Sequence, residues 1–131
     1  MNDRERFSSG APWEAKFGYS RLVRAGRQAW IAGTTAVDAS GAVLHPGDAQ
    51  AQTEAIFDKF RDALSKCGGE LRHVVRTRVF LIDLADFDAV ARAHGEAFGE
   101  IRPASTLVQV AGLIDPAMRV EIEADALLDE G

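Results

Sequence analysis

The chain has 131 residues, 47% of them hydrophobic, with a formal net charge of -5 and a single cysteine. This length fits one domain with a sizeable core, and one cysteine excludes an internal disulfide, in agreement with a reducing compartment. The acidic charge and the scattered Lys and Arg argue against a nucleic-acid partner, because phosphate neutralisation supplies most non-specific affinity.

Hydropathy along the chain argues against a membrane partner. No stretch approaches the roughly 18 continuous apolar residues that cross a bilayer, and residues 1–10 are polar, without the apolar region of a secretory signal. We therefore expect a cytoplasmic protein that forms one domain over residues 1–131. Within it, residues 1–12 are expected to be a loosely ordered N-terminal segment.

The first half of the chain predicts a hairpin followed by a helix. Tyr19–Val23 and Gln28–Thr34 flank a glycine-centred turn, which suits two antiparallel strands. Asp38–Gly41 predicts a second turn. Asp48–Cys67 carries an apolar stripe at helical spacing, with Asp48 as a plausible N-cap and a Gly-Gly pair as the stop.

The second half predicts a strand, a helix and two further strands. Val74–Ile82 is rich in β-branched residues and has substantial side chains on both faces, which indicates a strand covered on both sides. Asp86–Phe98 has a second helical stripe. Thr106–Val110 and Arg119–Leu127 predict the last two strands, and the latter alternates apolar residues with carboxylates.

This order of elements predicts helical crossovers over one face of a single sheet. The other face of the sheet is then left uncovered. Because Val74, Phe80 and Ile82 cannot all be exposed to water, we expect that face to pack against other subunits. The pattern therefore predicts an oligomer.

The sequence offers few groups for metal or nucleophilic chemistry. His45, His73 and His94 show no ligand spacing, and the lone Cys67 cannot form a thiolate cluster, so no metal site is expected. Gly-rich phosphate loops and a G-x-S-x-G elbow are absent. His94 lies on an apolar helix stripe, which favours a packed histidine over a catalytic one.

Three carboxylates share one face of the last predicted strand. Glu121, Glu123 and Asp125 are two residues apart, roughly 7 Å each. Carboxylates this close raise one another's pKa when partly buried, and one held in that way can position and deprotonate a water. The alternative is a solvated face or ion pairing with Arg76 and Arg78, and the pattern alone favours that alternative.

Several short motifs occur together in an order that resembles the RidA (YjgF) family, from roughly Ala11 to Leu127. They are Gly18-Tyr19-Ser20, Gly33, Gln52-Thr53, Val75 to Leu84 with Asp86-Phe87, Pro103-Ala104 and Val120-Glu121-Ile122-Glu123-Ala124. The resemblance implies a chorismate-mutase-like α/β (α+β) fold with one mixed sheet and two helices on one face. It also implies a homotrimer with a central barrel and small-molecule clefts between neighbouring subunits.

The resemblance implies an activity as well. Typical members hydrolyse reactive enamines and imines such as 2-aminoacrylate to a 2-keto acid and ammonia, without a metal or organic cofactor. In this sequence Tyr19 matches the cleft tyrosine and Glu121 the glutamate that orients the attacking water. Gly33 matches a glycine beside the cleft, whose backbone can approach the ligand closely.

Three positions depart from the family pattern. Ser105 replaces an arginine that clamps the substrate carboxylate, Leu107 replaces a cysteine, and Ala32 replaces a serine before the cleft glycine. A hydroxyl offers one neutral bond where a guanidinium offers two charge-assisted ones. Arg21, Arg102 and Arg119 are candidates to substitute for it, and the loop at Arg102 is a further candidate to hold a carboxylate through its backbone N–H groups.

Three functions therefore stay open. The first is hydrolysis of a small imine or enamine with Glu121 and water as the working pair. The second is a trimer that binds a metabolite without turning it over, which the Ser105 replacement favours. The third and weakest is RNA cleavage, the activity behind the older L-PSP name, which the acidic charge does not favour.

Overall fold

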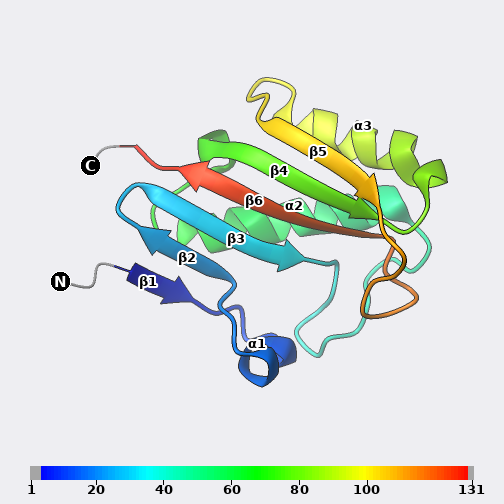
Figure 1. Cartoon of the computed structure of the whole chain (residues 1–131), viewed down its shortest axis with the longest axis horizontal. Coiled ribbons are helices and arrows are strands. Elements are labelled where there is room, and N and C mark those ends of the chain that lie inside the picture. The colour runs from blue at the N-terminus through cyan, green and yellow to red at the C-terminus, as the bar shows by residue number, and fades with distance from the viewer. Residues whose placement is uncertain (1–3, 130–131) are drawn as a thin grey trace.

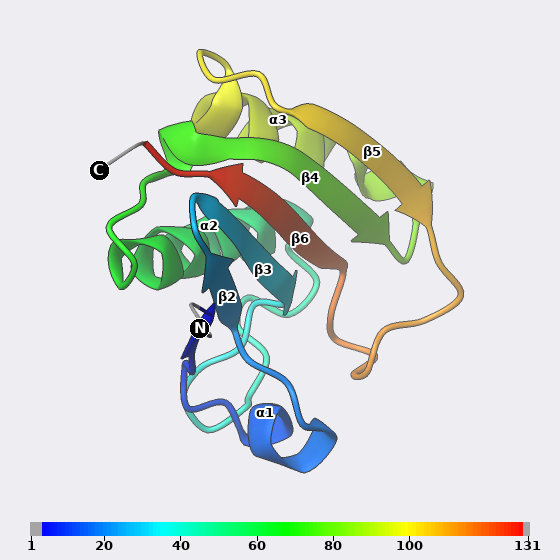
Figure 2. The same ribbon diagram turned by 60° about the vertical axis from the view of Figure 1, so that its left-hand side comes forward.

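The computed structural model describes residues 4–129 of the chain (Figure 1). Within these residues, six strands form one mixed sheet in the order β1-β2-β3-β6-β4-β5, and two long helices cover one face (Figures 1 and 2). The strands are β1 (Arg4–Phe7), β2 (Leu22–Ala25), β3 (Gln28–Thr34), β4 (Val74–Leu81), β5 (Ala104–Gln109) and β6 (Val120–Leu127). The helices are α1 (Pro12–Phe17), α2 (Ala49–Ser65) and α3 (Phe87–Phe98), with short 3-10 helices at Leu71–His73 and Leu84–Asp86. This architecture confirms the predicted α+β fold.

The two long helices make the crossover connections expected from the element order. β4 and β5 are parallel neighbours joined through α3. β3 and β4 are both antiparallel to β6, so they run parallel to each other with β6 between them, and α2 joins them. The last strand in sequence therefore lies at the centre of the sheet, next to β3 and β4.

The core lies between α2 and the covered face of the sheet. Phe57 and Phe60 of α2 are buried with their ring centroids 5.6 Å apart, and Ile122 of β6 is buried with them. Asp48 caps α2 as predicted, because its side chain accepts a hydrogen bond from the N–H of Ala51 at 3.0 Å. Between residues 4 and 129, no helix has both the length and the apolar character of a membrane span.

The N-terminal region differs from the expected loose segment. Arg4–Phe7 is an edge strand paired antiparallel with Leu22–Ala25, and Pro12–Phe17 is a short helix that ends at Gly18 in the left-handed region. The first three side chains of β1 are exposed, so the strand is held by its backbone pairing with β2. For the same reason its sequence shows no alternation of apolar and polar residues. Residues 1–3 of the expected segment lie outside the described residues.

A β-bulge in β4 corrects the expected position of Val74. We expected Val74 on the uncovered face, but the register with β6 shifts between Val74 and Arg76. The extra residue turns Val74 into the core and leaves Val75 48% exposed. Phe80, which pairs in register with Glu121, stays on the uncovered face.

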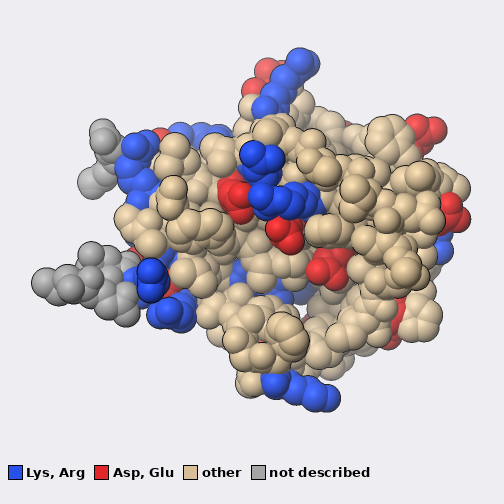
Figure 3. Space-filling view, in the orientation of Figure 1, with Lys and Arg blue, Asp and Glu red and all other residues tan. Residues whose placement is uncertain are grey.

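The uncovered face carries a group of ion pairs in a largely uncharged surface (Figure 3). Arg78 lies 3.0 Å from Glu123 and 3.4 Å from Asp125, and Arg76 lies 3.9 Å from Asp125. The interpretation of ion pairing is therefore confirmed for two of the three carboxylates of β6. Glu121, the third, has a different environment.

Candidate functional site

Glu121 lies against the backbone of Gly33, where the pairing of β3 with β6 is irregular. The register between these strands shifts between Ile31 and Thr34. A Cβ atom on residue 33 would collide with the Glu121 carboxylate, so a glycine is needed for the two to lie this close. The absence of a side chain at Gly33 therefore leaves room for the carboxylate.

The Glu121 carboxylate is half-buried and has no hydrogen bond or ion pair to any other residue between 4 and 129. Burial raises the pKa of Glu121 above its ordinary value, the charge of Arg21 opposes this shift, and Glu123 adds to it. A carboxylate with a raised pKa and unoccupied lone pairs can accept a proton from a bound water. The sequence pattern alone favoured a solvated face or ion pairing for all three carboxylates, and Glu121 is the member that makes no ion pair within residues 4–129.

Glu121 borders a cavity of about 1200 Å³. Tyr19, Ala32 and Gly33 line it together with Glu121, so the structure brings these four predicted site residues to one place. The face seen in Figure 3 is hollowed between the sheet and the α1 segment. Lys59 of α2 also lines the cavity, and burial lowers the pKa of its amine.

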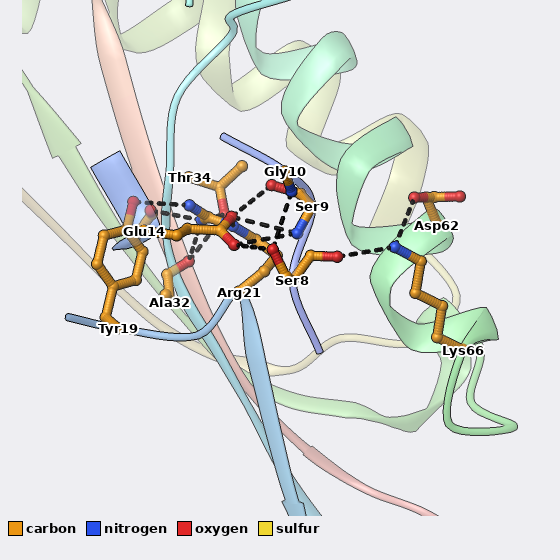
Figure 4. A network of polar contacts seen from close by, with 11 residues as sticks. Ser8, Ser9, Gly10, Glu14, Tyr19, Arg21, Ala32, Thr34, Asp62 and Lys66 are labelled. Atoms are coloured by element: carbon orange, nitrogen blue, oxygen red, sulfur yellow. Dashed lines mark hydrogen bonds and ion pairs between the residues drawn. The ribbon is translucent and has the colours of Figure 1, made fainter. Parts of the chain in front are cut away.

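Arg21 organises the wall of this cavity (Figure 4). Its guanidinium donates hydrogen bonds to the Tyr19 hydroxyl at 3.0 Å, to the Gly33 carbonyl at 2.8 Å and to Thr34 Oγ1 at 2.8 Å. The guanidinium carbon also lies 5.4 Å from the centre of the Tyr19 ring. One side chain thus contacts both the tyrosine and the glycine that line the cavity together with Glu121.

Glu14 holds Arg21 in turn. It is buried, its carboxylate lies 3.4 Å from Arg21 Nε, and it accepts hydrogen bonds from Ser8 Oγ at 2.7 Å and the Ser9 N–H at 3.1 Å (Figure 4). Burial by itself would raise the pKa of Glu14, but the bonds from Ser9 and Ser8 and the charge of Arg21 outweigh it, so the pKa is lowered. Glu14 is therefore an ionised anchor that ties the N-terminal segment to the cavity wall.

The remaining predicted binding residues lie elsewhere in the same chain. Ser105 and Leu107 belong to β5, at the far edge of the sheet, with β4 between them and β6. Arg102 precedes β5, is exposed, and donates from Nε to the Gly99 carbonyl at 3.0 Å. None of these three residues lines the cavity formed by residues 4–129 of one chain.

The three arginines that were candidates to replace the missing guanidinium differ in their position and in their bonding partners. Arg21 lines the cavity but is engaged by the bonds described above. Arg119 is paired with Asp86, with Nη2 at 2.7 Å and Nε at 2.9 Å. Arg102 lies outside the cavity. Within the described part of one chain, therefore, no predicted substitute offers an unengaged guanidinium to the cavity.

Sequence reasoning missed Glu14 and Lys59. Glu14 belongs to a short helix whose apolar pattern is too brief to predict, and its burial follows from a contact with Arg21, seven residues later. Lys59 lies beside the predicted stripe of α2, and no sequence signal distinguishes it from a solvated lysine. Among residues 4–129, no group of three His, Cys, Asp or Glu side chains is placed to hold a metal ion.

The chain is similar to several known proteins. The family model for Endoribonuclease L-PSP matches residues 10–128. An uncharacterized protein of Streptomyces coelicolor is 43% identical over 122 residues, covering 92% of this chain and 90% of that protein. The 3-aminoacrylate deaminase RutC of Acinetobacter baylyi is 36% identical over 108 residues, covering 82% of this chain and 85% of that protein.

Solved structures show the same fold. The crystal structure of Rv2704 from Mycobacterium tuberculosis, a member of the YjgF/YER057c/UK114 family, superposes with a TM-score of 0.86 at 40% identity. The match covers 95% of this chain and 99% of that one. Fold and site together define a small α+β protein with a cavity bordered by Glu121. The chain belongs to the RidA (YjgF/L-PSP) family.

Proposed function

We propose that this protein hydrolyses small reactive imines and enamines to a keto product and ammonia, with a water molecule positioned by Glu121. The observation that carries the proposal is the Glu121 carboxylate itself, which is half-buried, unpaired within residues 4–129 and open to a cavity. The similarity to RutC supports the substrate class, because 3-aminoacrylate is an enamine.

The chemistry follows from the groups around the cavity. An enamine first gains a proton on carbon, which gives the iminium, and an imine reaches the same ion by gaining a proton on nitrogen. Ionised Glu121 takes a proton from the water as its oxygen attacks the iminium carbon, which gives a neutral carbinolamine. Protonated Glu121 then returns this proton to the nitrogen, and its carboxylate takes the hydroxyl proton as ammonia leaves and the carbonyl forms. The net reaction consumes one water for each imine and releases one ammonia, which carries away the proton gained at the start as ammonium.

Tyr19 is the second working group. Because Arg21 donates to its hydroxyl oxygen, the phenolic proton is free to point away from the arginine. That proton can stabilise negative charge that develops on the substrate during the reaction. Arg21 acts through Tyr19 and Gly33 and is a positioning residue.

We further propose that the active unit is a homotrimer with the cavity closed by a neighbouring subunit. The uncovered sheet face carries Trp30, which is 42% exposed, and the ion pairs of β4 and β6. β5 is an edge strand on which Ser105 is exposed. A neighbour that docked its β5 edge against the cavity would bring Ser105 and Leu107 to Glu121, which one chain cannot do.

A binding function without turnover is the second candidate. The engaged state of Arg21 and Arg119 favours it, because a substrate carboxylate then finds no free guanidinium among the proposed substitutes. RNA cleavage, which the description of the family model names, is the third. A tight ligand recovered unchanged supports the second, and salt-sensitive cleavage of RNA by the purified protein supports the third.

The test is a hydrolysis assay with the purified protein and enamines generated in situ from several amino acids. Ammonia and keto-acid release are followed against buffer alone. The proposal expects acceleration with at least one of these imines. Equal rates with and without protein for the whole series contradict it.

A further inference from the structure

A polar chain runs from the edge of the sheet into the protein at β5, remote from Glu121 of the same subunit. From the outside inward, it consists of Ser105 of β5, Thr77 of β4 and His94 of α3. We propose that these three residues form a hydrogen-bond relay whose outer hydroxyl, that of Ser105, binds an anionic oxygen of the ligand. The role given to Ser105 rests on the proposed function, because a neighbour's β5 must close the cavity.

The geometry of the relay is continuous. Thr77 and Ser105 are register partners on parallel strands, and their Oγ atoms lie 2.8 Å apart. Thr77 Oγ1 also lies 2.9 Å from Nε2 of His94. Thr77 is fully buried, whereas Ser105 is exposed at the edge of the sheet. Figure 1 shows β4, β5 and α3 side by side at this end of the molecule.

Proton counting gives the relay a direction. The Thr77 hydroxyl has one proton, so it can donate either to Ser105 or to His94. If it donates to Ser105, His94 supplies its Nε2–H to Thr77, and the Ser105 proton is free for a ligand oxygen. If it donates to His94, Ser105 must donate inward and has no proton left for a ligand. An anionic ligand therefore selects the state in which His94 is the donor.

Protonation of His94 stabilises this state, which the neutral ring reaches only in its Nε2–H tautomer. Its ring packs against Phe57 of α2 at 5.7 Å and Phe98 of α3 at 4.8 Å between centroids, with Thr77 on the strand side. The charged neighbour Arg92 is directed to Gln50 at 2.9 Å. Burial lowers the pKa of His94. Protonated His94 can only donate through Nε2, so proton uptake and anion binding favour each other.

This arrangement would orient the Ser105 hydroxyl before a ligand binds. The hydroxyl of an isolated serine rotates freely, whereas Thr77 and His94 behind Ser105 fix the direction in which its proton points. Hydrogen bonds in such chains also polarise one another. The relay thus gives the closed cavity an oriented donor, and at lower pH a partial positive charge, whereas the three candidate arginines are engaged or lie outside the cavity of residues 4–129.

The experiment measures binding of pyruvate, a small 2-keto acid, by calorimetry across a pH series. The wild-type protein is expected to bind more tightly as pH falls through the pKa of His94, with uptake of a proton. Ser105→Ala is expected to weaken binding about tenfold and to lose this pH dependence. Ser105→Thr restores the hydroxyl and is expected to recover both.

Two further variants test the inner groups. His94→Gln keeps an N–H donor but does not titrate, so it should bind with an affinity insensitive to this protonation. Thr77→Val is nearly isosteric, cuts the relay and should resemble Ser105→Ala; Thr77→Ser is its control. NMR titration of His94 provides a direct readout, because pyruvate should raise the pKa of His94 in the wild type and not in Ser105→Ala.

The outcomes separate this inference from the proposed function. If Ser105→Ala binds pyruvate as tightly as the wild type and with the same pH dependence, the relay is overturned even where imine hydrolysis is found. Failure of the wild type to bind pyruvate at any pH also overturns it. If binding depends on Ser105 and His94 but no imine is hydrolysed, the relay stands and the catalytic proposal falls.

Discussion

The Glu121 carboxylate lies so close to Gly33 that a single methyl group on residue 33 would strike it. This contact joins two elements that are far apart in sequence, because β6 runs between β3 and β4. The bulge in β3 and the absence of a side chain at Gly33 together make room for a half-buried acid at the edge of a cavity. The proposed chemistry depends on that placement.

Gly33→Ala tests this contact. The new methyl group should displace the carboxylate, and a misplacement of about 1 Å can lower kcat/KM about a hundredfold. The measurement is imine hydrolysis together with thermal unfolding. Gly95→Ala is the matched control, because a Cβ there meets open space in an exposed helix and should stabilise the protein by about 0.5–1 kcal/mol. Wild-type activity in Gly33→Ala would contradict the assigned role of the contact.

The raised pKa of Glu121 predicts both an activity profile and a stability effect. Activity requires the carboxylate, so kcat should fall as pH drops through the raised pKa. A raised folded-state pKa means that ionised Glu121 costs stability above that pKa, and that the cost disappears at lower pH. Glu121→Gln should therefore unfold at a higher temperature than the wild type near neutral pH, and the difference should vanish in acid. An unchanged melting temperature near neutral pH would show that burying the ionised Glu121 carboxylate does not lower the stability of the protein.

The pair of Arg21 and Glu14 predicts a large effect on stability. Arg21→Gln leaves a buried carboxylate without its cation, which typically costs on the order of 3 kcal/mol. Chemical denaturation measures this cost. Arg24→Gln breaks an exposed pair with Glu5 and is the control, with a loss expected below about 1 kcal/mol. Similar losses in both variants would remove the special role assigned to Arg21.

Glu14 also predicts a loss of stability in acid. Its folded-state pKa lies below the ordinary value of 4.5, so its contribution is complete above that value and disappears as pH falls through the folded pKa. Denaturation curves between pH 6 and pH 3 should show a falling free energy of unfolding. Glu14→Gln should flatten this decline. An equally steep decline in that variant would assign the acid sensitivity to other carboxylates.

The uncovered sheet face predicts an oligomer in solution, and the proposed function makes that oligomer a trimer. Sedimentation should give a mass about three times that of the 14.1-kDa chain. Trp30→Glu places a charge on this face and should yield single chains without hydrolytic activity. Leu84→Glu changes a similarly exposed apolar residue outside the sheet and should leave the mass unchanged. A wild-type mass of one chain would remove the closed cavity from the proposal.

Periodic elements could be predicted from the sequence, and elements defined by their neighbours could not. The stripes of α2 and α3 and the alternation of β6 each bury one face of the element, and a buried face leaves a pattern in the sequence. Arg4–Phe7 becomes a strand only by pairing with Leu22–Ala25, so its own residues indicate nothing. The bulge after Val74 likewise depends on the partner strand.

In the candidate site, too, some residues could be predicted from motifs, whereas the roles of others depend on contacts that only the fold creates. Glu121, Tyr19 and Gly33 were named from motifs, and the structure brings them to one cavity. Ser105 was named with them, but it lies on β5 at the far edge and can join them only across subunits. Arg21 was considered as a ligand for the substrate, whereas its contact with Glu14 makes it part of the wall. No pattern in the sequence reveals a pairing that depends on how two irregular segments fold together.

The most direct measurement is the rate of in-situ imine hydrolysis by Glu121→Gln beside Glu54→Gln, an exposed glutamate of α2. Loss of a positioned general base typically lowers the rate about a hundredfold or more, so Glu121→Gln should be nearly inactive while Glu54→Gln keeps the wild-type rate. Full activity of Glu121→Gln, in a protein that folds and assembles normally, would contradict the account.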